Sequence, residues 1–257
     1  MPANPKPTEL IAVTGKGGVG KSTIAALIIG YLKANSPGPI LALDADPDAN
    51  LAAMLGISVQ TTIGDLREDL LREMKNFPAG MSKQNYVEAG LHQIIVETPG
   101  LDLITMGRSE GPGCYCFINN LLRKFADDLT PSYQWVVIDN EAGMEHLSRR
   151  IASRIDHLIV VVNAGPLSIA CAGRIDKLLH DLDRDVRNKY FLLNAVRADR
   201  VAAVKDRMAG LSLEYLGAVP HDDAIEDAIL RGEPVCSLDG SLAAGAIREV
   251  MQRIGAG

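Results

Sequence analysis

The sequence has little that would suit a nucleic-acid-binding protein or a membrane protein. Asp and Glu outnumber Lys and Arg by 32 to 26, which gives a formal net charge of −6. Sequence-independent DNA binding depends on basic side chains that neutralise phosphates, so the charge balance weighs against nucleic acid as a partner. No apolar run reaches the roughly 20 residues that a membrane-spanning helix needs, and residues 1–7 lack the apolar core of a secretory signal. We therefore expect neither a nucleic-acid nor a membrane partner.

Cysteine is also scarce, with four residues at irregular positions in a chain of 257. This pattern favours a reduced, cytoplasmic location over a disulfide framework. Cys171 and Cys236 each stand alone, and a buried or idle thiol is the simplest interpretation of both. Cys114 and Cys116 differ, because they form a C-x-C pair that directly follows Gly111-Pro112-Gly113.

The overall composition, 47% hydrophobic and 23% charged, is ordinary for a globular protein. Apolar runs that suit buried parallel strands alternate with helix-compatible segments. This alternation is typical of one doubly wound α/β domain with a mostly parallel sheet. We expect a disordered, proline-containing lead-in over residues 1–8, a single domain over 9–257 and a helical surface insertion of unknown purpose over 61–93. The predicted strands are 10–13, 40–43, 101–105, 135–139, 158–162 and 190–193, and the predicted helices include 23–32, 117–129 and 167–182.

The most informative stretch is Gly15-Lys16-Gly17-Gly18-Val19-Gly20-Lys21-Ser22, which lies between a predicted strand and a predicted helix. In this context G-x-x-x-x-G-K-[ST] is typical of a phosphate-binding loop. The glycines let backbone N–H groups turn toward phosphate oxygens, and the positive end of the following helix assists. Lys21 would reach the β- and γ-phosphates, and the Ser22 hydroxyl would hold Mg²⁺. The predicted nucleotide contacts extend from Gly15 to Thr23.

The same stretch contains G-x-G-x-x-G at Gly15, Gly17 and Gly20, so a dinucleotide-binding fold is the alternative. Asp44, near the end of the second predicted strand, would then bind the ribose. However, Lys21-Ser22 directly after the last glycine has no role in a dinucleotide site and a specific role in a nucleoside triphosphate site. We therefore favour the triphosphate.

Acidic residues follow two of the predicted strands. Asp139 ends the strand over 135–139, which has the form of a Walker B strand with its acid beside Mg²⁺. The run Asp44-Ala45-Asp46-Pro47-Asp48 ends the strand that begins at residue 40, at the sheet edge where ligands bind in open α/β folds. A calcium-binding loop is the alternative for D-x-D-x-D, but Ala49 and Leu55 stand where that loop needs glycine and glutamate. We therefore place both acidic segments beside the phosphate-binding loop.

The C-x-C pair by itself is compatible with two idle thiols, a local disulfide or a metal site. Two thiolates cannot fill a coordination sphere, but a symmetric dimer would bring four to one axis. Soft thiolates suit Ni²⁺, Zn²⁺, Cu⁺ or an iron–sulfur cluster, and they do not suit Mg²⁺ or Ca²⁺.

With Lys16 after its first glycine, the phosphate-binding loop resembles the deviant P-loop of the MinD, ParA and nitrogenase iron protein superfamily. The resemblance implies that Lys16 reaches across a homodimer interface to the partner's nucleotide. In the D-x-D-P segment it implies that Asp46 orients or activates the attacking water and that Asp44 supports Mg²⁺ or its waters. It also implies that Asn194, at a strand end, contacts the adenine ring, although Ala195 departs from the usual Asn-Lys pair.

Two further sequence segments narrow the resemblance to one subfamily. They are Cys114-Tyr115-Cys116 and the run from Asp139 to Leu147, which contains A-G-x-E-H-L. With the first two segments they are similar to the CooC-type ATPases that help insert nickel into carbon monoxide dehydrogenase. The resemblance implies a dimeric, Mg²⁺-dependent ATPase that binds Ni²⁺ or Zn²⁺ at a site shared by Cys114 and Cys116 of both chains. It further implies a client, the apo-enzyme of carbon monoxide dehydrogenase.

Two other functions remain open. An electron-transfer ATPase resembling nitrogenase iron protein would hold a [4Fe–4S] cluster across the dimer, but the cysteines of that family are far apart in sequence. A ParA- or MinD-like positioning ATPase would need a basic DNA-binding surface or a basic amphipathic C-terminal helix. The segment Leu242–Ile254 has only two arginines and no strong aromatic anchor.

Overall fold

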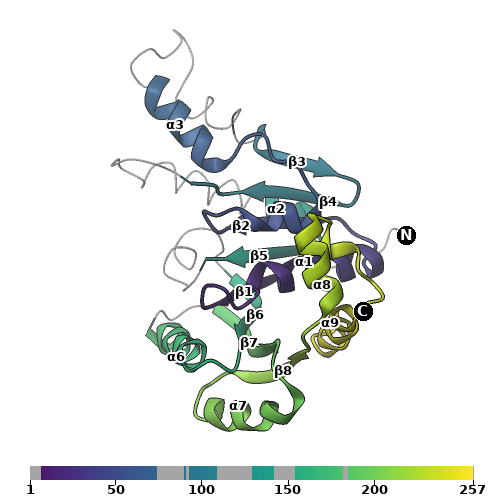
Figure 1. The fold of residues 1–257 in the computed structure, drawn as a ribbon. Helices are drawn as coiled ribbons and strands as arrows, with labels where there is room; N and C mark the ends of the chain where they lie inside the picture. The colour runs from purple at the N-terminus through teal and green to yellow at the C-terminus, as the bar shows by residue number, and fades with distance from the viewer. Residues whose placement is uncertain are drawn as a thin grey trace, which may run out of the picture.

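The computed structural model describes residues 7–73, 90, 93–108, 129–141, 154–181 and 185–256. Within this part, eight strands form one sheet in the order β3-β4-β2-β5-β1-β6-β7-β8 (Figure 1). All neighbouring strands are parallel except β3 and β4. The predicted mostly parallel α/β fold is thereby confirmed. The strands are β1 Glu9–Gly15, β2 Ile40–Ala45, β3 Ile95–Thr98, β4 Leu101–Thr105, β5 Trp135–Asn140, β6 Arg154–Val162, β7 Asp185–Asn194 and β8 Glu214–Val219.

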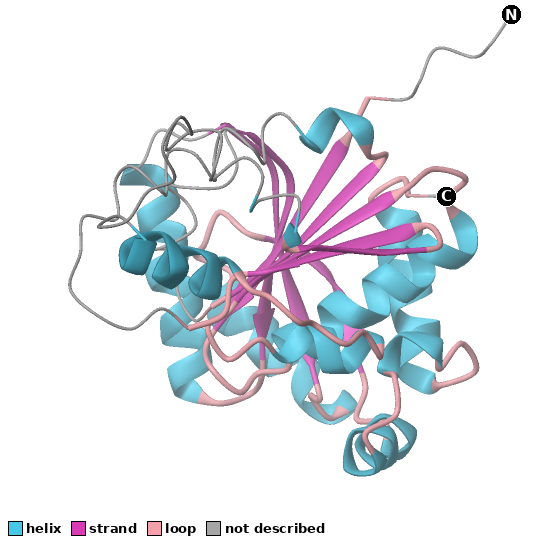
Figure 2. Ribbon diagram, turned by 90° about the horizontal axis from the view of Figure 1, so that it is seen from above, coloured by secondary structure: helices cyan, strands magenta, loops and turns pink. Residues whose placement is uncertain are grey.

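Helices cover both faces of the twisted sheet (Figure 2). Residues of α1, α2 and α9 form one buried apolar cluster with one face, and residues of α6 and α7 form a second cluster with the other. The helices are α1 Lys21–Asn35, α2 Asn50–Leu55, α3 Ile63–Glu73, α6 Pro166–Asp181, α7 Val201–Met208, α8 Asp223–Arg231 and α9 Leu242–Arg253. Short 3₁₀ helices occupy Thr130–Ser132, Ala198–Arg200 and Val235–Ser237.

The central strands are mostly apolar because both of their faces are covered. In β1, Ile11 and Val13 pack in the cluster with α1, and Leu10 and Ala12 pack in the cluster with α6. Helix α1 is apolar around most of its circumference, as expected of a helix enclosed by protein. Its buried residues include Ile24, Ala25, Ala26, Leu27, Ile28, Ile29 and Leu32. Burial of β1 and α1 fixes the loop between them.

The edge of the sheet differs from the prediction, which had no strand over 95–98, directly after the helical insertion expected over 61–93. Strand β3 pairs antiparallel with β4, and only Pro99 and Gly100 connect them. Gly100 has φ +78°, which suits the third position of a tight turn after proline. The Pro-Gly pair between two apolar runs was the signal for this hairpin.

Helix α3 confirms the helical part of the predicted insertion. Thr62 and Asp65 cap its start reciprocally, since the Asp65 N–H donates to Thr62 Oγ1 over 3.2 Å and the Thr62 N–H donates to Asp65 Oδ2 over 2.9 Å. The predicted Glu68–Arg72 ion pair is present, with 3.4 Å between Oε2 and Nη2.

Several predicted features lie outside the described residues. These are residues 1–6 of the lead-in, the C-x-C pair, the helix over 117–128 and the segment after Glu141 that contains A-G-x-E-H-L. Thr8, which was predicted to belong to the lead-in, donates a hydrogen bond from its hydroxyl to the Tyr133 carbonyl over 2.8 Å. No helix in the described part of the chain is both long enough and apolar enough to cross a membrane.

Candidate nucleotide-binding and ATPase site

The glycine-rich loop joins the buried end of β1 to the start of α1. Gly15 has φ +150°, and a Cβ added there would lie 2.5 Å from the Val161 carbonyl oxygen of neighbouring β6. Gly20, at the N-cap of α1, has φ +89°, and an added Cβ would lie 2.3 Å from Asn194 Nδ2. A side chain at either position would therefore clash or strain the backbone. Both glycines are required by the shape of the loop.

The first turn of α1 presents the cationic and hydroxyl groups that the motif predicted. Lys21 and Ser22 are its first two residues, and Lys21 is only 6% exposed. The first turn contains no acidic residue, and no side chain among the described residues caps it. Unpaired backbone N–H groups and a buried ammonium at a helix N-terminus favour a phosphate group.

The two predicted magnesium residues lie side by side at the carboxyl edge of the sheet. Asp44 of β2 and Asp139 of β5 occupy the same register position, and Thr105 of β4 is level with Asp44. Asp139 is fully buried, and neither of its carboxylate oxygens has a hydrogen-bond partner among the described residues. Ser22 acts on this carboxylate without reaching hydrogen-bond geometry. A buried carboxylate without a partner is costly, which indicates that a cation belongs beside it.

The charge state of Asp139 follows from this environment. Burial raises its pKa to about 7, the Ser22 hydroxyl and Lys21 act in the opposite direction, and Asp44 raises it further. The hard oxygen atoms of Asp139 and Ser22 fit Mg²⁺, which prefers carboxylate and hydroxyl ligands.

Asp44 has a second role that the sequence did not reveal. Its Oδ1 accepts a hydrogen bond from the Asp46 N–H over 3.2 Å, and its Oδ2 accepts one from the Leu51 N–H over 3.0 Å. Burial raises the pKa of Asp44 to about 6, and these backbone hydrogen bonds oppose the shift. Asp44 therefore shapes the turn between β2 and α2 as well as facing Asp139.

Asp46, the predicted water-positioning residue, lies in this turn beside the strand ends. Its Oδ1 accepts a hydrogen bond from the Asp48 N–H over 3.0 Å, and its carbonyl accepts one from the Ala49 N–H over 3.0 Å. Ala49 has φ +53°, a left-handed conformation that a residue with a Cβ rarely adopts. The turn thus has a defined shape and holds Asp46 partly exposed at the site.

Lys16 and Asn194 both contact the loop in the single chain. Lys16 is half-buried, and its Nζ donates to the Gly17 carbonyl over 3.2 Å within the same loop. Asn194, at the end of β7, donates from Nδ2 to the Val19 carbonyl over 2.8 Å. Two interpretations therefore stay predictions. One is that Asn194 contacts adenine, and the other is that Lys16 acts across the subunit interface. What the structure adds is that Asn194 supports the loop.

Two residues that sequence reasoning missed also support the site. Asn140, directly after Asp139, donates from Nδ2 to the Val13 carbonyl over 2.9 Å and so ties β5 to β1 beside the loop. Arg108, three residues after β4, contacts Asp48 with 2.6 Å between Nη2 and Oδ1. Asn140 lies in the run from Asp139 to Leu147, but that resemblance assigned it no role, and Arg108 belongs to no recognisable motif.

The described cysteines agree with the prediction of isolated thiols. Cys171 is buried on α6, and Cys236 is half-buried with its Sγ 3.8 Å from the Leu55 carbonyl oxygen. Burial raises the pKa of the Cys236 thiol, which makes it less reactive.

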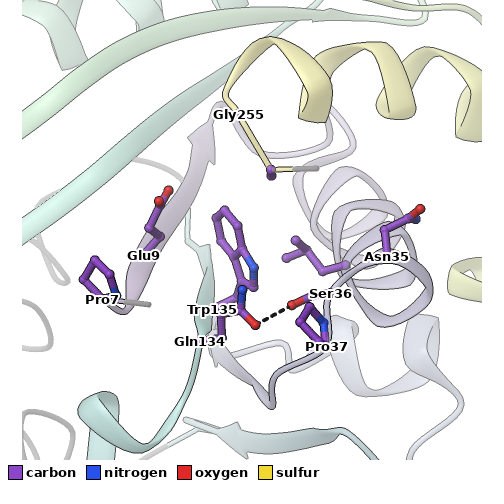
Figure 3. A pocket seen from close by; sticks show the side chains of 10 residues that line it. Pro7, Glu9, Asn35, Ser36, Pro37, Gln134, Trp135 and Gly255 are labelled. Carbon is purple, nitrogen blue, oxygen red and sulfur yellow. Dashed lines mark hydrogen bonds between the residues drawn. The ribbon is translucent and has the colours of Figure 1, made fainter. Parts of the chain in front are cut away.

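Two other features of the described part lie away from the phosphate-binding loop. A pocket lies at the amino ends of β1 and β5, and its lining includes Trp135, Glu9, Asn35 and Pro37 (Figure 3). Ser36 closes one side by donating to the Gln134 amide oxygen over 3.0 Å. An exposed trio of His221, Asp223 and Glu226 has ligand atoms within 4.8 Å of one another, but the two His221 nitrogens each face a different carboxylate.

Comparisons with known proteins agree with this geometry. Residues 10–235 match the CobQ/CobB/MinD/ParA nucleotide binding domain family. An uncharacterized ATP-binding protein from Methanocaldococcus jannaschii is 42% identical over 89% of this chain and 91% of its own length. The carbon monoxide dehydrogenase accessory protein CooC from Rhodospirillum rubrum is 33% identical over 85% of this chain and 86% of its own length. The MinD cell division protein of Aquifex aeolicus has a TM-score of 0.70 and 25% identity, with 97% of this chain and 98% of that chain covered.

A strand, a glycine loop and a helix, with a lysine on the helix and buried acids on adjoining strands, define a P-loop nucleoside triphosphatase. The chain belongs to the CobQ/CobB/MinD/ParA nucleotide-binding family, and it is an ATP-binding ATPase of the MinD and ParA kind. Its fold implies ATP or ADP with Mg²⁺ as ligands. This assignment supports the triphosphate interpretation of Lys21-Ser22 over the dinucleotide one.

Proposed function

We propose that this ATPase is a metallochaperone that binds Ni²⁺ or Zn²⁺ through Cys114 and Cys116 and assists nickel insertion into carbon monoxide dehydrogenase. One observation carries the proposal. A chain 33% identical to CooC over 85% of its length also has a C-x-C pair, which a generic ATPase does not need. The metal is the cargo, and ATP hydrolysis controls its release.

The ATPase step rests on the phosphate-binding loop and the two acidic strand ends. Lys21 and the N–H groups of α1 neutralise and orient the β- and γ-phosphates. Ser22 and Asp139 would hold Mg²⁺, with Asp44 level with Asp139 on the neighbouring strand, and bound Mg²⁺ would neutralise charge on the phosphate oxygens. Asp46 positions the attacking water in line with the γ-phosphate. Catalysis here is positioning together with charge stabilisation, so small displacements of these groups change the rate.

A nucleotide-dependent homodimer completes the site. In the described part of the single chain, the Lys16 ammonium donates to the Gly17 carbonyl of its own loop. A second copy facing the carboxyl edge of the sheet would give Lys16 a better acceptor, the partner's nucleotide phosphates. ATP therefore favours the closed dimer, and hydrolysis loosens it.

Ligand counting leads to a shared metal site. One chain offers two thiolates in the C-x-C pair, whereas Ni²⁺ and Zn²⁺ bound by thiolates usually take four donors. A two-fold axis between two copies supplies four. The stoichiometry that follows is one metal ion per two chains.

Equilibrium dialysis with Ni²⁺ and Zn²⁺, combined with native mass measurement, tests the shared site with and without ATP. We expect one metal ion per dimer, and its loss in Cys114→Ser/Cys116→Ser with nucleotide binding unchanged. Affinity falls as pH drops, because protons compete for the thiolates. Cys171→Ser, Cys236→Ser and His221→Ala are matched controls that retain binding. One metal ion per isolated chain, or full binding by the double-serine variant, contradicts the proposal, and loss only in His221→Ala assigns the metal to the exposed trio.

A client assay tests the delivery step. Apo-carbon monoxide dehydrogenase incubated with Ni²⁺, ATP and this protein should gain activity faster than with Ni²⁺ alone. The double-serine variant should give no acceleration. Equal activation by both proteins would remove the cysteine pair from delivery.

A positioning ATPase is the second candidate, because the fold closely resembles that of MinD. Helix α9 argues against a membrane-binding version, since Ala243, Ile247, Val250 and Met251 of its apolar face are buried in the core. Co-sedimentation with anionic vesicles in the presence of ATP distinguishes the candidates, because a membrane-binding positioning ATPase would sediment with the vesicles and a metallochaperone would not. Visible absorption after anaerobic purification would instead indicate an iron–sulfur protein.

A further inference from the structure

The turn that carries Asp46 is connected to a distant part of the chain by one ion pair. Arg108 Nη2 lies 2.6 Å from Asp48 Oδ1, although the two residues are 60 positions apart. Both belong to segments that leave neighbouring strands at the site, since β2 precedes Asp48, β4 precedes Arg108, and β2 pairs with β4. The pair therefore bridges two loops at the catalytic edge of the sheet.

The backbone before Arg108 is firmly held, so its side chain extends from a fixed point. The Met106 N–H donates to the Asp44 carbonyl over 2.7 Å, and the Met106 carbonyl accepts from the Gly64 N–H over 2.8 Å. A Cβ added at Gly64 would lie 2.2 Å from the Arg108 carbonyl oxygen, which shows how closely the start of α3 packs there. Gly107 has φ +66° and packs against Thr62 in the same way.

The partner of Arg108 is linked in turn to the carboxylate of Asp46. The Asp48 N–H donates to Asp46 Oδ1 over 3.0 Å. The position of Asp48 therefore sets the rotation of the Asp46 carboxylate, because that hydrogen bond fixes one oxygen and directs the other. The chain of contacts runs from the Arg108 guanidinium to the Asp48 carboxylate, and from the Asp48 N–H to Asp46.

We propose that Arg108 and Asp48 are positioning residues for ATP hydrolysis, which hold the turn so that the Asp46 carboxylate faces the attacking water. The inference rests on the proposed role of Asp46. Neither residue touches the phosphates in this scheme, and both act through Asp46. The pair is exposed, with Arg108 at 75% and Asp48 at 59%, so its effect on rate is modest, roughly 2- to 5-fold.

Steady-state ATPase kinetics of Arg108→Ala, Asp48→Ala and the double variant test this proposal, at one protein concentration and saturating Mg²⁺. We expect kcat to fall roughly 2- to 5-fold in each single variant, with KM for ATP and the unfolding temperature unchanged. The double variant should be no slower than Arg108→Ala, because that substitution already removes the ion pair that Asp48→Ala breaks. Arg108→Lys should recover part of kcat. Raising the salt concentration should narrow the difference between wild type and Arg108→Ala, because an exposed pair is screened.

Arg72→Ala is the matched control. Arg72 is also 75% exposed and also paired with acidic side chains, but it lies on α3 and contacts Glu68 and Asp69. It should leave kcat unchanged. An unchanged kcat in Arg108→Ala, or a double variant whose loss is the product of the two single losses, overturns the positioning role. If Asp46→Ala also turns over ATP at the wild-type rate, the proposed role of Asp46 itself is wrong, whereas a slow Asp46→Ala with a normal Arg108→Ala removes only the present inference.

Discussion

At the scale of single residues, three side chains of the site are in environments that suit different tasks. Lys21 is buried at a helix N-terminus, Asp139 is buried without a hydrogen-bond partner in the described part of the chain, and Asp46 is partly exposed in a turn. Buried groups bind ions, and a partly exposed carboxylate can contact water. This division separates ligand binding from turnover and leads to two predictions.

Lys21→Ala should lose tight nucleotide binding, because it removes the charge that faces the β- and γ-phosphates. Asp46→Ala should still bind ATP but hydrolyse it more slowly by roughly 10²-fold or more, since water placement is lost. Nucleotide titration and single-turnover hydrolysis measure the two effects separately. Wild-type turnover in Asp46→Ala would exclude Asp46 from the mechanism.

Asp139→Asn should stabilise the nucleotide-free protein at pH 8 while weakening Mg²⁺-ATP binding. Burial raises the folded-state pKa of Asp139 to about 7, whereas an Asp in an unfolded chain has a pKa of about 3.9. Between these pH values the folded protein retains a proton that the unfolded chain has lost. Stability therefore falls as pH rises from about 4 to about 7, by at most about 4 kcal/mol. Asn is uncharged, so Asp139→Asn removes this dependence of stability on pH. Urea unfolding at pH 5 and pH 8 checks it, and an identical pH dependence in both proteins would show that Asp139 is not held with a raised pKa.

At the scale of elements, Asp222 joins the starts of α8 and α9. Its Oδ1 accepts from the Ala224 N–H over 3.0 Å, and its Oδ2 accepts from the Ala243 N–H over 2.8 Å. Burial acts to raise its pKa, but these hydrogen bonds outweigh burial and the pKa is lowered. One carboxylate therefore caps one helix and anchors a second.

Asp222→Ala should destabilise the protein by about 2 kcal/mol, since one helix cap and one further hydrogen bond, from the Ala243 N–H to the carboxylate, are lost. A lowered folded-state pKa stabilises the protein above the unfolded value near 3.9, and this contribution is lost as pH falls through the folded value. The difference between wild type and Asp222→Ala should therefore shrink in strongly acidic buffer. Urea unfolding measures this difference in the free energy of unfolding. Asp223→Ala, which changes the exposed neighbour, is the control. Equal losses of stability in the two variants would show that the Asp222 carboxylate does not join the two helices.

At the scale of the whole molecule, we propose that a second copy completes the site at the carboxyl edge of the sheet. Lys16→Ala should bind nucleotide as a monomer but fail to form the ATP-dependent dimer and fail to hydrolyse ATP. Its charge is needed only across the interface in this proposal, because Lys21 supplies the charge within the chain. Sedimentation with a non-hydrolysable ATP analogue measures dimer formation, and full ATPase activity in the variant would refute the cross-subunit role.

The features that the sequence alone could predict are those that depend on residues close together in the chain. The glycine loop, Lys21, Ser22 and Asp139 were identified because each is defined by its neighbours in the chain, and apolar runs located most strands for the same reason. Strand β3 was missed even though Pro99-Gly100 marked its turn, because a short edge strand carries little periodicity.

The tertiary structure decided the contacts that link distant segments. Asn194 reaches Val19 across 175 positions, Arg108 reaches Asp48 across 60, and Asp44 lies level with Asp139 only because β2 pairs with β5. Strand order and register come from packing both faces of the whole sheet, and no single segment specifies them. The sequence therefore determined which groups are candidates for the ATPase chemistry, and the fold decided which other groups contact them.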